Sequence, residues 1–245
     1  MKEKAGRNLP VLPAVPGFVL PALARWTHEE SMILADENAP FRSSFELGDD
    51  RLLLIAGDNA SGKSLAFRLI SQLCGQNRIE AMTLSVRERT GGGTFDMSRM
   101  RQALIFGEEE TSSTGAISAR VVRDGYRNLV GRHKPAILGL DEPELGLSEG
   151  YARALGEYIG LQARNIRGNV CGVMVVTHSR CLAQGILLGL GETPTFLGLS
   201  EAGCNPAPSV QAWIDDVERR SVEDLLSLPD RAHANFKRVN QIIGK

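Results

Sequence analysis

The stretch RLLLIAGDNASGKS, from Arg51 to Ser64, decides the fold. Its first part, Arg51 to Ala56, is an apolar run of strand length that ends at a glycine. A helix is expected directly afterwards, from Gly62 to Cys74. A strand that passes through a glycine-containing loop into a helix is how a parallel α/β unit begins.

The loop between this strand and this helix fits the pattern G-x-x-x-x-G-K-[ST] without a gap. Glycines let the backbone N–H groups turn inward toward phosphate oxygens, and the helix N-terminus adds its positive end. Lys63 is expected to reach the β- and γ-phosphates, and the Ser64 hydroxyl to ligate Mg²⁺. The alternative, a chance glycine-rich turn, is disfavoured by the flanking strand and helix. The expected phosphate-binding residues are Gly57, Asp58, Asn59, Ala60, Ser61, Gly62, Lys63 and Ser64.

Other short apolar segments alternate with helical ones along the chain. This alternation predicts an α/β fold with a mostly parallel sheet flanked by helices. The expected strands are Ser44–Leu47, Ile79–Arg87, Ala136–Leu140 and Val170–Val176, and the expected helices are 115–131 and Ser148–Ala163.

Three regions are expected. Residues 1–40 are interrupted by Pro10, Pro13, Pro16 and Pro21, so we interpret them as an extended lead-in rather than as an export signal, which would need an unbroken helix. Residues 41–205 form the main domain. Residues 206–245 form a helical segment that either covers the sheet, which we favour, or serves as a docking surface. Pro229 is expected to split it.

Composition restricts the classes of protein. The chain is 42% hydrophobic, enough for a packed core, and no apolar run approaches the ~20 residues that cross a bilayer. A net charge of −1 gives no overall attraction to nucleic acid. The four cysteines lack metal-ligand or C-x-x-C spacing, which favours reduced, mostly buried thiols over a disulfide or zinc site, and a cytoplasmic location.

Two acidic residues follow the buried strand Ala136–Leu140. Asp141 is expected to hold Mg²⁺, mostly through water, and Glu142 to polarise an attacking water. Adjacent residues at a strand end point to different sides, so one carboxylate can face the metal and the other the γ-phosphate. The competing interpretation is an acidic turn that caps the next helix.

A histidine follows the next strand. Val170–Val176 leads into Thr177 and His178, which places an imidazole where it can contact the γ-phosphate or the attacking water. A lone histidine is more often a structural residue, but its position relative to the other motifs favours a functional role.

Together these motifs resemble those of the ABC ATPase superfamily. The matching segments are GDNASGKS at 57–64, LGLDEPE at 138–144 and VVTHS at 175–179, in the family's order. The resemblance covers roughly residues 44–200 and implies a P-loop NTPase fold. It also implies that two cassettes sandwich two ATP molecules head to tail, with a signature loop of one subunit on the γ-phosphate held by the other.

The signature loop would lie at residues 111–116 (TSSTGA), before a helix. By this resemblance Ser113 takes the place of the signature serine and Gly115 that of the second glycine. A hydroxyl and backbone N–H groups at a helix N-terminus suit an anionic phosphate. The match is loose, because Thr114 replaces a glycine, and an ordinary Ser/Thr helix cap is the alternative.

Other family parts are less defined. Gln102 is available as the metal-sensing glutamine, and Trp26, Phe41 and Phe45 are open alternatives for stacking on adenine. The basic loop 87–101 either contacts a partner or phosphate or is simply solvated. The short interval between Lys63 and Ser112 leaves little room for a transporter's helical subdomain. DEPELG at 141–146 is more similar to the soluble SMC, RecF and OLD-like branch.

The sequence therefore predicts a compact ABC-type ATPase with a reduced helical subdomain that uses ATP and Mg²⁺. Lys63, Glu142 and His178 are the expected catalytic residues, and Ser113 and Gly115 are expected to act in trans in an ATP-bound homodimer. A protein partner in a defence or repair type of system is expected. The alternatives are the nucleotide-binding subunit of a transporter and a binding module that barely hydrolyses ATP. DNA binding lacks support in the sequence.

Overall fold

A six-stranded sheet forms the centre of the computed structural model, which describes residues 18–36, 38–85, 114–216 and 220–244. The strand order is β1-β6-β2-β5-β4-β3, and within it only β1 runs antiparallel to its neighbour. The expected α/β class with a mostly parallel sheet is confirmed. The strands are β1 (Phe41–Glu46), β2 (Asp49–Gly57), β3 (Glu80–Ser85), β4 (Ala136–Asp141), β5 (Val170–Thr177) and β6 (Pro194–Glu201).

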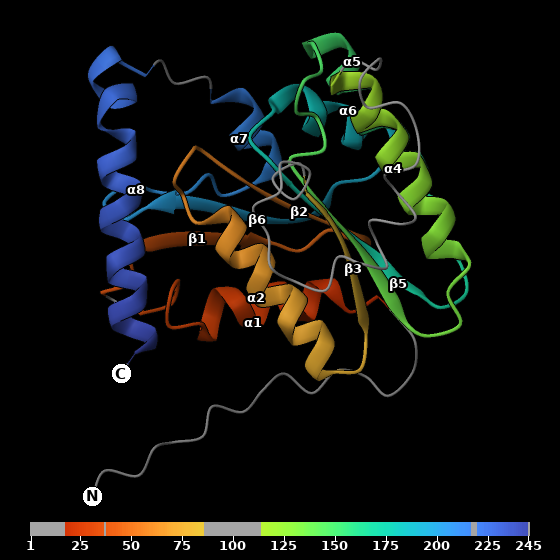
Figure 1. Ribbon diagram of the computed structural model, residues 1–245, viewed down its shortest axis with the longest axis horizontal. Coiled ribbons are helices and arrows are strands. Elements are labelled where there is room, and N and C mark those ends of the chain that lie inside the picture. The colour runs from red at the N-terminus through yellow and green to blue at the C-terminus, as the bar shows by residue number, and fades with distance from the viewer. Residues whose placement is uncertain (1–17, 37, 86–113, 217–219, 245) are drawn as a thin grey trace, which may run out of the picture.

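Helices cover both faces of this sheet (Figure 1). Leu53 and Ile55 of β2 pack in one apolar layer, under α1 and α2, while Leu52 and Leu54 pack in the other. Burial on both sides explains why β2, β4 and β5 contain continuous apolar runs rather than alternating patterns. The helices are α1 (Leu20–Glu30), α2 (Lys63–Gln76), α4 (Thr114–Val130), α5 (Glu149–Arg164), α6 (Arg180–Leu190), α7 (Val210–Asp215) and α8 (Val222–Ile243).

The chain reverses its direction across the sheet between β2 and β5. After β2 it passes through α2 to β3 at the far edge, whereas after β5 it passes through α6 to β6, on the other side of β2. α2 and α6 lie on opposite faces. In open α/β sheets a crevice forms outside the carboxyl ends of strands at such a reversal, and ligands bind there.

The lead-in differs from the extended segment that the prolines predict. Leu20–Glu30 forms helix α1, whose Leu20, Leu23 and Ala24 are buried against the sheet. Pro21 lies in the first turn, where its missing N–H costs no helical hydrogen bond, so the helix accommodates it without a break. A Cβ at Gly172 of β5 would lie 2.7 Å from Leu20, so helix and strand are in close contact.

The C-terminal region also differs from the expectation, because Pro229 does not split it. α8 runs through this proline, and α7 and α8 are two separate helices. Proline removes the hydrogen bond to the carbonyl of Leu225, a residue on the exposed side of the helix (65% exposed). Ser221 and Asp224 form a reciprocal capping box that fixes the start of α8.

Within the C-terminal segment α7 packs on the core, whereas α8 covers little of the sheet. Val239 is its buried residue, whereas α7 buries Val210, Trp213 and Ile214. Figure 1 shows α8 standing beside β1, away from α4, α5 and α6. Its exposed apolar residues are Val222, Leu225, Leu226, Phe236 and Ile243.

Several element boundaries shift by a few residues. β1 begins at Phe41 rather than Ser44, and β3 ends at Ser85, with the last expected residues outside the described part of the chain. α5 spans Glu149–Arg164 rather than the expected Ser148–Ala163, a shift of one residue at each end. In the described ranges no helix is long and apolar enough to span a membrane.

Glycines let α5 and α6 pack in backbone contact, and this arrangement supports a stability prediction. A Cβ at Gly156 of α5 would lie 2.1 Å from the carbonyl oxygen of Leu182 in α6. Gly156→Ala should therefore lower the free energy of unfolding by about 1–3 kcal/mol or more, measured by urea denaturation. The matched control is Gly150→Ala in the same helix, where a Cβ meets no atom within 4 Å. It should raise stability by about 0.5–1 kcal/mol. Equal effects of the two substitutions would contradict this packing.

Candidate functional site

The parallel register brings the sequence motifs to one end of the sheet. Ala56 of β2 is level with Thr177 of β5, and Asp141 of β4 is level with Val176. β5 lies between the other two strands, so the phosphate loop, the acidic pair and the histidine turn all emerge at neighbouring carboxyl ends. The expected grouping of these motifs is thus present in the fold.

The 57–64 loop has the backbone shape of a compact nest. Ala60 and Gly62 adopt positive φ angles of 62° and 90°. A Cβ at Gly57 would lie 2.1 Å from the carbonyl oxygen of Leu199, so this position requires glycine. Gly62 is the N-cap of α2 and supplies no capping side chain, which leaves the helix N-terminus suited to an anion.

Lys63 is the first residue of α2, directly after Gly62, and is only 6% exposed. Its Nζ donates hydrogen bonds to the carbonyl oxygens of Gly57 (3.0 Å) and Asp58 (2.7 Å). Burial lowers the pKa of Lys63, while the negative charges of Glu142 and Asp58 act in the opposite direction. Removing an ammonium group from water is unfavourable, and charge-assisted hydrogen bonds to phosphate oxygens would offset this cost.

The two carboxylates differ in their surroundings. Asp141 ends β4 and is 8% exposed. Glu142 follows in the left-handed region, with φ 51°, and its N–H donates to the carbonyl oxygen of Val176 (2.9 Å). A non-glycine residue in this region costs of order 1–3 kcal/mol, and such conformations concentrate at functional sites. The turn thereby separates the two adjacent side chains.

Glu142 and His178 are brought together. His178 Nδ1 lies 3.4 Å from Glu142 Oε1, and the side chains are 41% and 18% exposed. The hydrogen bond with Glu142 raises the pKa of His178, although desolvation opposes this. From the sequence we expected separate roles, with Glu142 as the base and His178 as the phosphate sensor. In the structure the two side chains interact directly.

This pairing gives a pH prediction. Because the folded-state pKa of His178 is raised above its usual value of about 6.5, the pair stabilises the fold fully below that pH. The contribution is lost as pH rises through the folded-state pKa. Glu142→Gln should therefore shift the imidazole resonance of His178 to titrate at lower pH, measured by NMR with His178→Asn to assign the signal. An unchanged titration would contradict the pairing.

A third carboxylate, Glu144, also belongs to this cluster, and the sequence interpretation assigns it no role. It is 6% exposed, and its Oε1 accepts a hydrogen bond from Thr177 Oγ1 at 2.5 Å. Burial raises the pKa of Glu144, and the Thr177 hydrogen bond opposes this. In the sequence, Glu144 is simply a further acidic residue in a turn between two apolar segments. Such a residue is usually exposed to solvent, so its burial was not expected.

The donor set fits a magnesium ion. Asp141 and Ser64 offer oxygen ligands, and Mg²⁺ is usually held by one or two protein oxygens together with substrate phosphates and water. Among the described residues no group of three or more His, Cys, Asp or Glu could hold a metal by itself. A site of this kind would therefore depend on the nucleotide to complete the coordination.

Several expected residues lie outside the described part of the chain, namely Ser113, Gln102 and the basic loop 87–101. Gly115, in the first turn of α4, is buried, and a Cβ there would lie 2.9 Å from the carbonyl oxygen of Gly146. Packing within the same subunit thus explains why position 115 is a glycine. Its expected role in trans stays a prediction.

The three aromatic alternatives for adenine stacking occupy different places. The ring of Phe41 lies beneath Gly62 and is 5% exposed, so it supports the loop from below. Phe45 stacks on His28, with ring centroids 6.3 Å apart, and lies further from the carboxyl end of β6. Trp26 lines a hollow with Leu47, at the opposite end of the sheet. None of the three is an exposed platform beside the phosphate loop.

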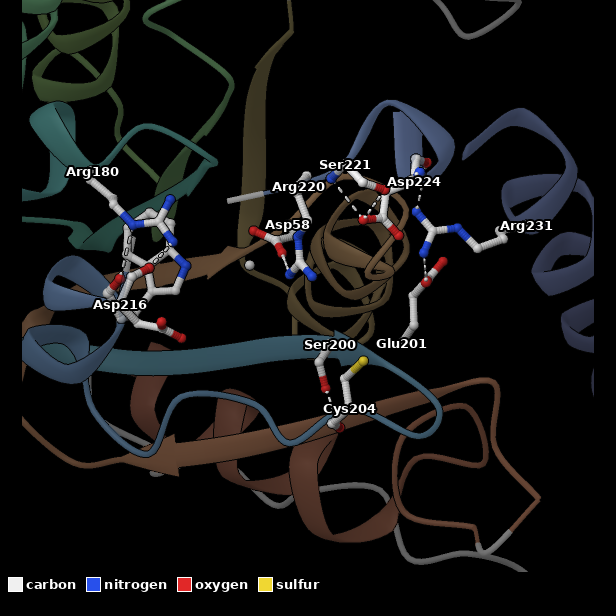
Figure 2. Close-up of polar contacts among 12 residues, drawn as sticks. Asp58, Arg180, Ser200, Glu201, Cys204, Asp216, Arg220, Ser221, Asp224 and Arg231 are labelled. Atoms are coloured by element: carbon white, nitrogen blue, oxygen red, sulfur yellow. Dashed lines mark hydrogen bonds and ion pairs between the residues drawn. The ribbon is translucent and has the colours of Figure 1, made fainter. Parts of the chain in front are cut away.

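The residue Arg220, just before the C-terminal helix, forms an ion pair with the phosphate loop. Figure 2 shows Arg220, just before α8, directed at Asp58. Further along, Arg231 pairs with Glu201 of β6 at 3.2 Å, and Asn235 donates to the same carboxylate. These polar contacts hold α8, since its apolar burial is small.

The four cysteines are free thiols. Cys74 and Cys171 are buried, Cys181 is half-buried and Cys204 is exposed, so the expected burial holds for only part of the set.

No protein-family model matches the chain, and a search of curated proteins finds no significant match.

Proposed function

We propose that this protein binds and hydrolyses ATP with Mg²⁺ as a soluble ABC-type ATPase. The observation that carries the proposal is the convergence of Lys63, Glu142 and His178 at the carboxyl ends of β2, β4 and β5. An anion-binding nest, a buried cation, and a carboxylate paired with an imidazole form a set that suits phosphoryl transfer to water.

Each part of the site has a distinct role in this proposal. The backbone of the 57–64 loop and Lys63 bind the β- and γ-phosphates. Ser64 and Asp141 would hold Mg²⁺, which offsets the negative charge of the phosphates when bound. Glu142 accepts a proton from the water that attacks the γ-phosphorus, the bond to the ADP oxygen breaks, and ADP and inorganic phosphate leave. His178 orients Glu142 and faces the transferring group.

The dimer is the second part of the proposal. By resemblance to ABC ATPases, Ser113 and Gly115 of one protomer would complete the ATP site of another, so the active form is a homodimer that assembles on ATP. The supply of ATP leads us to propose a cytoplasmic location. A protein partner, of the defence or repair type, would use the assembly.

The transporter alternative is supported only by the shared family motifs. The short interval between Lys63 and Ser112 disfavours it, and co-purification with a membrane protein would restore it. A module that binds ATP with little hydrolysis is the other alternative, and the Glu142–His178 pair disfavours it.

A turnover assay tests the proposal. Phosphate release from Mg-ATP is expected at roughly 1–10³ per second at saturation, the usual range of enzyme turnover. The specific rate should rise with protein concentration if two protomers build each site. Tight ATP binding without phosphate release would leave only the binding-module alternative, and the absence of ATP binding would refute the proposal.

A further inference from the structure

Glu144 lies in the turn that follows the acidic pair, but its side chain reaches toward another strand. The residue is almost fully buried, and it accepts a hydrogen bond from the hydroxyl of Thr177 at the end of β5. Its second oxygen, Oε2, is buried and makes no hydrogen bond within the described residues. A carboxyl group buried this deeply is costly, so a purely apolar filling of the same space would be more favourable for folding.

The Thr177 hydroxyl makes two hydrogen bonds at once. It donates to Glu144 and accepts from the backbone N–H of Ser179 at 2.8 Å. Ser179 then caps α6, since its Oγ accepts from the N–H of Leu182 at 3.2 Å. Thr177 itself is fully buried.

His178 stands between these two anchored residues. Thr177 fixes the turn before it, and the Ser179 N–H and cap fix the turn after it. A backbone held on both sides determines where the imidazole projects, and it projects to within 3.4 Å of Glu142. Without the Glu144 acceptor, the Thr177 hydroxyl would have an unmatched donor in a buried position and would tend to rotate away.

We propose that Glu144 is a positioning residue which, through the Thr177 hydroxyl, holds the 177–179 turn so that His178 faces Glu142. The role rests on the proposed function, because it matters for turnover only if Glu142 acts on water. It is separate from the proposed phosphate binding, because neither Glu144 nor Thr177 belongs to the 57–64 loop.

The first experiment uses paired variants of the full chain. Glu144→Leu and Thr177→Val remove the acceptor and the hydroxyl, and each should lower kcat at least about 10-fold with the KM for ATP within about 3-fold, since the phosphate loop is untouched. Glu144→Gln and Thr177→Ser keep the hydrogen bond and should retain kcat within about 3-fold of wild type. The double variant should lose no more than the worse single one, because both act through one contact.

Two kinetic outcomes would overturn the proposal. One is wild-type kcat in Glu144→Leu or Thr177→Val. The other is an equal loss in Glu144→Gln and Glu144→Leu, which would point to the charge rather than to the hydrogen bond. If Glu144→Leu does not fold, as judged by circular dichroism, Glu144→Met takes its place, because methionine keeps nearly the same length and removes the carboxylate acceptor without touching the bond between Thr177 and the Ser179 N–H.

An NMR experiment separates this proposal from the proposed function. The imidazole of His178 should titrate closer to its ordinary pH in Thr177→Val than in the wild type, and Thr177→Ser should restore the wild-type value. This readout does not require ATP turnover. A wild type that hydrolyses no ATP would therefore refute the ATPase function while the NMR result still decides the positioning role. Identical titrations in all three proteins would refute the latter.

Discussion

Glu142→Gln is expected to lower kcat for ATP hydrolysis by roughly 10²- to 10⁴-fold, the range for loss of a positioned general base. The amide would keep the shape of the side chain but could not accept the proton of the attacking water. The affinity for ATP should stay within a few-fold of wild type, because the substituted group lies at the end of β4 and the phosphate loop follows β2. Phosphate release and equilibrium binding of a fluorescent ATP analogue would measure the two effects.

The matched control for this substitution is Glu157→Gln. Glu157 is exposed on α5, and its carboxylate belongs to none of the site contacts described above. It should leave both turnover and binding unchanged. A Glu142→Gln protein that turns over ATP like the wild type would show that another group acts as base and would remove the basis for the Glu142–His178 assignment.

Lys63→Ala is expected to weaken ATP binding by about 100-fold or more, since each charge-assisted hydrogen bond to phosphate contributes about 1.5–3 kcal/mol. The backbone nest and the helix N-terminus would remain, so weak binding should persist. Folding stability without nucleotide should fall little, because the buried ammonium is itself penalised by desolvation, as its lowered pKa indicates. Isothermal titration calorimetry would measure the affinity and urea denaturation the stability.

Lys134→Ala is the control for the loss of a positive charge, because Lys134 is exposed in the turn before β4. It should bind ATP like the wild type. Equal Kd values for Lys63→Ala and the wild type would contradict the placement of phosphate at the 57–64 loop.

Much of the site could be predicted because local and long-range signals agree there. The apolar run Arg51–Ala56, the phosphate loop and the helix after it each specify the same strand–loop–helix unit. Ala136–Asp141 and Val170–Thr177 are buried on both faces, so their sequences are uninterrupted apolar runs. Parallel strands then bring their carboxyl ends together, which makes the grouping of the motifs predictable.

The features that could not be predicted from the sequence depend on contacts between segments that are far apart in the chain. α1 is stabilised by packing against β5, which local proline content does not reveal. Glu144 was not recognised because only the fold places Thr177 beside it. The ion pair between Arg220 and Asp58 joins residues far apart in the sequence, and nothing in either segment indicates the other. α8 continues through Pro229, which the proline rule by itself does not predict.

In the assembly that we propose, two copies of this chain enclose ATP at their phosphate loops. Size-exclusion chromatography with light scattering on Glu142→Gln, with and without Mg-ATP, tests it most directly, because removal of the base should trap the assembled state. We predict a monomer of 26.6 kDa without nucleotide and a dimer of twice that mass with Mg-ATP. A monomer at high protein concentration with ATP demonstrably bound would contradict the homodimer, and a different partner would then have to complete the site.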